Sequence, residues 1–232
     1  MESNETKIKR VLKTAGVFNW ARQNFQRFDD TLRQVWNIAE DPPRISLGPI
    51  NKICTKLANR EITFEDAMKQ CEGYKGHLRM AADEILPVFY NYLIENQIDT
   101  VSGFAEERYP YPFGRDEGGK VRTIPVQPTF IALQGERAIP TFVLGWTKPD
   151  FSYHQIRLIS TIIADAVLTQ QDFIGSDAMI ITLPRSKWGK HREIRRWMVS
   201  SYANMSREEL QTQFDRYNRA VRQVVEELKG RE

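Results

Sequence analysis

The stretch Pro184–Trp197, PRSKWGKHREIRRW, concentrates residue types that can bind an anion. It holds six Lys or Arg, one His and two Trp around a single Glu. Arginine donates paired hydrogen bonds to phosphate or carboxylate, and tryptophan rings can stack on nucleic-acid bases. The stretch is either a polyanion-binding surface or the solvated face of a helix. The candidate polyanion-binding residues are Arg185, Lys187, Trp188, Lys190, Arg192, Arg195 and Arg196.

Residues 189–202 separate by chemistry when they are placed on a helix at 100° per residue, which predicts an amphipathic helix. Its apolar side would hold Ile194, Trp197, Met198 and Tyr202. Its opposite side would present Arg192, Arg195 and Arg196 together to solvent. We therefore expect Trp197 to be anchored in the core and the three arginines to be replaceable without unfolding. Trp188 precedes this helix and is the more exposed aromatic candidate.

The net charge of +3 conceals an uneven distribution along the 232 residues. Residues 6–28 carry six Lys or Arg and no acid, and residues 185–196 have a net charge of +5, so the remainder carries −8. Two basic stretches on an otherwise acidic chain are more informative about a binding surface than the near-neutral total.

A second candidate site lies at the start of the helix expected over 152–168. Trp146, His154 and Gln155 could line a pocket there, because a helix N-terminus attracts anions. The alternative is that His154 is a half-solvated residue of the first turn. The chain has no phosphate-binding glycine loop, no GxSxG elbow and no paired Cys/His metal motif, so we expect no catalytic residue, no cofactor and no metal site.

The apolar periodicity predicts an α+β protein with a small mixed sheet, a hairpin plus one further strand, packed on a central helix. The N- and C-terminal regions should be helical. Helices are expected over 17–40, 47–59, 77–97 and 152–168, and others should begin after Thr63 and Ser206. Thr63, Ser152 and Ser206 each open a capping-box pattern, and Pro87 should kink or split the 77–97 helix.

The hairpin strands are expected at Thr129–Leu133 and Ala138–Trp146, followed by a strand within 177–184. Pro125, Pro128 and Pro140 cannot donate to a ladder and should lie at strand ends, edges or bulges. Residues 1–98 form a helical region and residues 99–232 an α+β core with C-terminal helices. We expect the two to make one continuous globular domain.

This order of helix, strands, core helix and strand is similar to the core of PD-(D/E)XK nuclease-like domains. In those families, acids on two strands and a helix hold a divalent metal. The matching strand here is FVLGWTK, Phe142–Lys148, where Gly145 or Trp146 stands in place of an acid, and Glu84 corresponds to the helix acid. The resemblance covers about half of the chain and implies such a fold without metal-dependent cleavage of DNA or RNA.

The two cysteines, Cys54 and Cys71, with no secretory signal and no membrane span, indicate a cytoplasmic protein with reduced thiols and no membrane partner. The leading hypothesis is a non-catalytic binding module whose basic helical surface engages nucleic acid or an acidic protein. One alternative is a protein–protein assembly subunit that uses amphipathic terminal helices. Another is a catalytically degenerate nuclease-like domain, or an enzyme of unfamiliar type with a pocket near Trp146 and His154.

Overall fold

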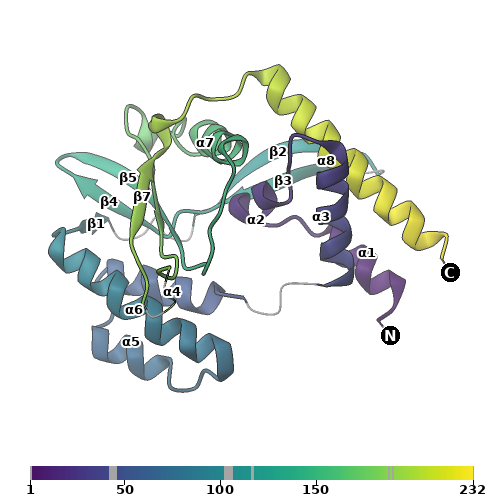
Figure 1. The fold of residues 1–232 in the computed structure, drawn as a ribbon. Coiled ribbons are helices and arrows are strands. Elements are labelled where there is room, and N and C mark those ends of the chain that lie inside the picture. Colours follow the sequence, from purple (N-terminus) through teal and green to yellow (C-terminus); the bar gives the residue numbers. More distant parts are fainter. Residues whose placement is uncertain are drawn as a thin grey trace.

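The computed structural model of the chain describes residues 2–41, 46–101, 107–115, 118–187, 189 and 191–231. Its centre is a five-stranded mixed sheet in the order β1-β4-β5-β6-β7, and β2 and β3 form a separate two-stranded sheet (Figure 1). Strands β5 and β6 run parallel, and the other neighbouring pairs are antiparallel. The strands are β1 Asp99–Val101, β2 Tyr109–Arg115, β3 Val121–Val126, β4 Phe130–Gln134, β5 Arg137–Leu144, β6 Met179–Thr182 and β7 Arg195–Met198. The predicted α+β class with a small mixed sheet is confirmed.

The expected hairpin is the β4–β5 pair, which is joined by a two-residue turn after Gln134. Gly135 has φ +62 in this turn, a backbone conformation that favours glycine and suits a tight hairpin. Strand β5 ends at Leu144, two residues earlier than expected. Its pairing with β6 begins only at Thr141, so Pro140 lies where β5 has a single hydrogen-bonded neighbour.

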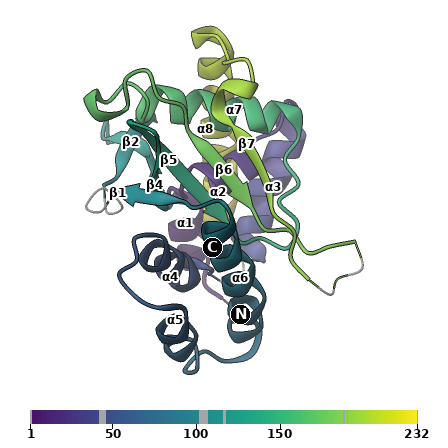
Figure 2. The ribbon, with the colours of Figure 1, turned by 90° about the vertical axis from the view of Figure 1, so that its left-hand side faces the viewer.

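Alternating side chains of the sheet enter two separate cores, as the two-residue period of a strand requires. Phe142 and Leu144 face one core, whereas Val143 between them faces the other. Helices α4, α5 and α6 cover the Val143 face, and α7 with α2 and α8 covers the Phe142 face (Figures 1 and 2). The helices are α1 Asn4–Leu12, α2 Val17–Arg22, α3 Phe28–Glu40, α4 Gly48–Ala58, α5 Phe64–Gln70, α6 Gly76–Glu95, α7 Tyr153–Ala166 and α8 Arg207–Lys229, with 3-10 turns at Gln171–Phe173 and Val199–Ser201.

The helix starts agree with the local sequence signals. Ser152 and Ser206 each form a complete capping box with the residue three positions on. The Thr63 hydroxyl accepts a hydrogen bond from the Asp66 amide at the start of α5. These polar side chains satisfy amide groups that the first helical turn leaves without a partner.

One helix expectation is wrong. The helix expected over 17–40 is two helices, because the buried Asn24 side chain donates to the Trp20 carbonyl and ends α2. Of the kink or split expected at Pro87, the split does not occur, since α6 continues through that residue as one helix. Proline leaves the carbonyl of Asp83 without its helical donor, and Asp83 is exposed, so water can replace that donor.

Both cysteines are buried and free. Among the residues that the structure describes, no helix is long and apolar enough to cross a membrane.

Replacing either Ile159 or Ile163 of α7 with Asp should unfold the protein. Both side chains are fully buried between the sheet and the outer helices, so an unpaired carboxylate would enter an apolar core. We expect a loss of about 4 kcal/mol or more in the free energy of unfolding, measured by urea titration. Tyr153→Asp, at an exposed position of the same helix, is the control and should change it little. Unchanged unfolding of the Ile variants would contradict this placement.

Candidate functional site

The basic stretch is not a helix, so that prediction is wrong. Arg185 and Arg192 face each other in an isolated antiparallel bridge, and Arg195–Met198 form β7 beside β6. The helical spacing of the apolar residues is overridden because the buried strand β6 would otherwise leave backbone groups unpaired along one edge.

The strand conformation also separates the arginines that were expected to point outward together. Trp197 packs against the α7 side of the sheet, as an anchor was expected to do, whereas Met198 packs against the α6 side. Because strand residues alternate, Arg195 lies on the same face of the sheet as Trp197, and Arg196 lies on the same face as Met198. Arg196 lies 3.5 Å from the Tyr92 hydroxyl, and Arg195 pairs with Glu193.

The other candidates of this stretch have different positions. Lys187 is exposed, and Trp188 and Lys190 lie outside the described residues. Arg192 is only 5% exposed, so it is a buried charge and not a surface contact.

Arg192 and Arg185 share the carboxylate of Glu84 on α6. Arg192 Nε donates to Glu84 Oε2 at 2.8 Å, and Arg185 donates to both carboxylate oxygens at 2.9 and 2.5 Å. Arg192 also donates to the carbonyls of Gly145 and Leu183. This cluster ties α6 to the ends of β5 and β6.

The charges of the cluster depend on one another. Hydrogen bonding from Arg185 is the largest influence on Glu84 and lowers its pKa, although desolvation opposes the shift. The pKa of Arg192 is lowered because its burial outweighs the attraction of Glu84. Two guanidinium groups against one carboxylate leave the cluster with an excess positive charge.

The residues around the ends of β5 and β6 do not fit the divalent metal that the nuclease-like order of elements implies. The order α6, β1, β4, β5, α7, β6 is present, but a Cβ at Gly145 would lie 2.6 Å from Ile85 Cδ1. A carboxylate at Gly145 would therefore require the Ile85 side chain of α6 to move. Glu84 is held by two arginines, and the described residues contain no group of three His, Cys, Asp or Glu side chains placed to hold a metal ion.

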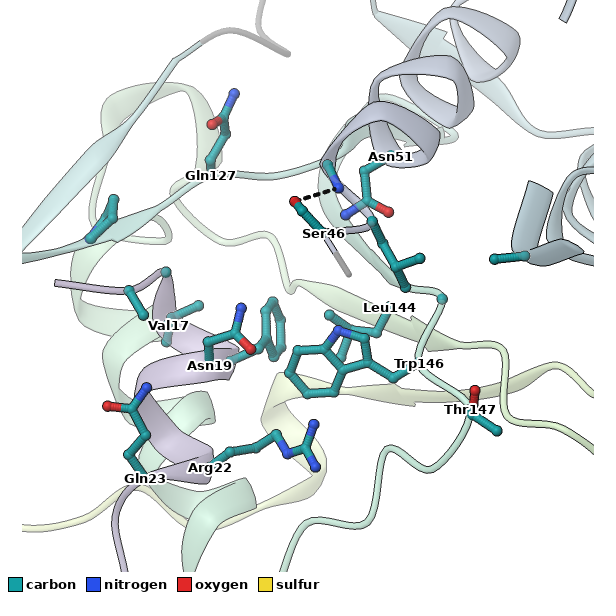
Figure 3. A pocket seen from close by; sticks show the side chains of 18 of the residues that line it. Val17, Asn19, Arg22, Gln23, Ser46, Asn51, Gln127, Leu144, Trp146 and Thr147 are labelled. Atoms are coloured by element: carbon teal, nitrogen blue, oxygen red, sulfur yellow. Dashed lines mark hydrogen bonds between the residues drawn. The ribbon is translucent and has the colours of Figure 1, made fainter. Parts of the chain in front are cut away.

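A cleft of about 1140 Å³ opens above this cluster, between α2, the start of α4 and the end of β5 (Figure 3). It brings together cations from both basic stretches of the sequence and from two further loops. Among the described residues that line it there is no Asp or Glu. Its basic residues are Arg10, Lys13, Arg22, His77, Arg108, Lys148, Arg185 and Arg192.

Several of these cations are exposed to solvent and have no hydrogen-bond or ion-pair partner among the described residues. Within the described part of the chain, the side chains of Lys13, Arg108 and Lys148 make no hydrogen bond or ion pair. Arg22 is also exposed, and its guanidinium lies 4.7 Å from the centroid of the Trp146 ring. Arg10 is engaged, since it donates to the Ala39 carbonyl and pairs with Glu2.

Of the three expected pocket residues, one lines the cleft and two lie behind it. Trp146 lines the cleft, whereas His154 and Gln155 are not among its lining residues. Gln155 is buried and donates to the carbonyls of Ala21 and Asn24 at 3.1 Å, behind α2. His154 Nε2 is 3.0 Å from Gln213 Oε1, and burial lowers its pKa. Gln155 therefore positions the end of α2 from behind, whereas His154 contacts Gln213 of α8.

Four residues of the cleft were not predicted as site residues: Lys13, Arg22, Arg108 and Lys148. The charge of residues 6–28 was a signal for the first two. Arg108 and Lys148 are isolated cations in loops, and only the fold brings them to the cleft.

Comparison of the chain with protein-family models, curated proteins and solved structures returns no match. The function is therefore argued from the chemistry of the site itself.

Glu84→Gln should destabilise the protein by about 3 kcal/mol, because it leaves the buried Arg192 without its compensating charge. The free energy of unfolding from urea titration measures this loss. Glu72→Gln, an exposed acid-to-amide change nearby in the sequence, is the matched control and should have little effect.

The Glu84→Gln and Glu72→Gln variants should also differ in how their unfolding free energy changes at acidic pH. The folded-state pKa of Glu84 is lowered from 4.5, so its stabilisation is present above pH 4.5 and is lost as the pH falls through the lowered value. Glu84→Gln should therefore reduce the decline in unfolding free energy below pH 4.5 relative to the Glu72→Gln control. An equal decline in both variants would contradict the role given to Glu84.

Proposed function

We propose that this protein is a non-catalytic nucleic-acid-binding module that holds the sugar–phosphate backbone in the basic cleft. The observation that carries the proposal is the convergence of seven Lys or Arg and one His on one cleft, with no acid among its described lining residues. The site is thus a cleft built from distant segments and not the basic helix that the sequence suggested. The cytoplasmic location expected from the sequence belongs to the same proposal.

The physical basis is the release of counterions from the polyanion. Each phosphate that a Lys or Arg neutralises releases condensed cations, which favours binding without reading base sequence. A concave surface lined by charges of one sign also focuses the field and raises the local concentration of the anion. Lys13, Arg108 and Lys148 supply this field most directly, because they are exposed and unpaired within the described residues.

The size of the cleft favours a polymer over a small phosphorylated ligand. Its volume of about 1140 Å³ exceeds the range of about 300–1000 Å³ that is usual for small-molecule sites. Its cations are also spread over separate elements: Lys13 follows α1, Arg108 precedes β2 and Lys148 follows β5. Cations from separate elements can contact more than one phosphate of a polymer at a time.

The assembly role that was considered for the terminal helices has less support. The apolar stripe of α8 is buried against α2, α3 and β2 of its own chain. The aromatic side chains Phe214 and Tyr217 of this stripe contact the ring of Trp20 on α2. The apolar stripe of α8 is therefore buried within its own chain and is not exposed for contact with another protein.

Replacing Lys13, Arg108 and Lys148 together with Gln should weaken the binding of a fluorescent oligonucleotide, duplex or single-stranded. Each lost phosphate contact should reduce the slope of log affinity against log salt by about 0.7 to 0.9, so we expect a slope flatter by about two to three. Fluorescence anisotropy over a series of salt concentrations measures this change. Thermal melting should be nearly unchanged, because all three side chains are exposed.

The matched control replaces Lys69, Arg222 and Lys229 with Gln. These three exposed cations do not line the cleft, and the net charge changes by the same amount. An equal weakening in both variants would show that binding follows total charge and not the cleft. If the wild-type protein binds no nucleic acid at low salt but binds polyglutamate, an acidic protein is the partner and the proposal is wrong.

A further inference from the structure

We infer that the ligand of the cleft is single-stranded nucleic acid, and that one base stacks on Trp146 in the place that the Arg22 guanidinium now occupies. This inference rests on the proposed function and goes beyond it, because it names the form of nucleic acid and a second kind of contact. Binding of phosphates alone would serve duplex and single strand alike.

The geometry of the Arg22–Trp146 pair supports a stacking site. The guanidinium carbon lies 4.7 Å from the ring centroid, and both residues line the cleft (Figure 3). Trp146 is half-buried and is supported by Phe151, at 5.7 Å between ring centroids. The indole is therefore held by the protein while Arg22, which covers it, is an exposed side chain.

A base can displace the guanidinium at little cost. An exposed cation–π contact favours binding by a factor of about two to five, whereas stacking of a base on an aromatic ring contributes a factor of about 5 to 150. A displaced Arg22 keeps its charge and can pair with a phosphate in the same cleft. The exchange thus gains a stacking contact and an ionic contact together.

Neutral amides in the cleft are suited to the edges of unpaired bases. Asn19 of α2 and Asn51 of α4 lie on opposite walls of the cleft (Figure 3). Within the described residues, neither side-chain amide makes a hydrogen bond. Amide side chains can donate to and accept from base edges, which a single strand exposes and a duplex keeps paired.

The deciding probes are a labelled oligothymidine, an abasic deoxyribose-phosphate strand of equal length, and a duplex, each titrated by anisotropy at one low salt concentration. The wild-type protein should bind oligothymidine about 5- to 150-fold more tightly than the abasic strand, because only the former has bases to stack. The duplex should behave like the abasic strand, since its bases are already stacked on one another. Trp146→Leu should remove most of the preference for oligothymidine and leave abasic binding unchanged, and contacts from the amides account for any small preference that remains.

Trp36→Leu is the matched control. Trp36 also lies beneath an arginine, with the Arg231 guanidinium 4.6 Å from its ring, but it does not line the cleft. It should leave the preference for oligothymidine intact. If circular dichroism shows that Trp146→Leu is unfolded, the affinities of the wild-type protein for the three probes still test the preference for single strands.

The outcomes separate the two proposals. Equal wild-type affinity for all three probes would overturn the single-strand inference and leave binding of nucleic acid through phosphates intact. An undiminished preference for oligothymidine in folded Trp146→Leu would overturn the role of Trp146. Binding of none of the probes would remove the proposed function and this inference with it.

Discussion

The arrangement depends on one electrostatic constraint, the compensation of the buried Arg192 charge by Glu84. A guanidinium removed from water costs several kcal/mol unless it is paired and hydrogen-bonded, and Arg192 meets that demand with one carboxylate and two backbone carbonyls. Its acceptors come from α6, from Gly145 just after β5 and from Leu183 just after β6. If these elements separate, Arg192 loses all three acceptors at once. The pair therefore holds one layer of helices to the sheet directly beneath the cleft.

A second network fixes the opposite wall of the cleft. Gln155 of α7 and Gln213 of α8 reach the backbone and side chain at the end of α2, where Asn24 is fully buried. Inside a protein such bonds are strengthened by the low dielectric, and an unmade one is correspondingly expensive. The network sets the position of α2 relative to the end of β5. That position is what brings Arg22 over Trp146.

Local rules predicted the parts of the fold that depend on neighbours in sequence. The helices after Ser152 and Ser206 and the hairpin at Gly135 follow from caps, apolar stripes and a turn. The parts that failed depend on distant partners. Strand β7 forms because β6 lies beside it, and the break between α2 and α3 is stabilised by Gln213, almost two hundred residues away. The site failed for the same reason: its cations share no segment, and Arg192, which looked exposed on a helical wheel, is the buried ion of the Glu84 cluster.

The cleft itself opposes folding. Like charges gathered on one concave surface repel one another. Two acids offset part of this charge: Glu84 is shared by Arg185 and Arg192, and Glu2 pairs with Arg10. Surface pairs such as Lys9–Glu5 and Arg157–Glu209 show that this chain does pair its cations where no cleft is concerned. A local arrangement that works against stability, inside a fold that otherwise satisfies its charges, is the pattern expected of a binding site. In the proposed complex a polyanion would relieve this repulsion, so the charges that weaken the free protein would favour binding.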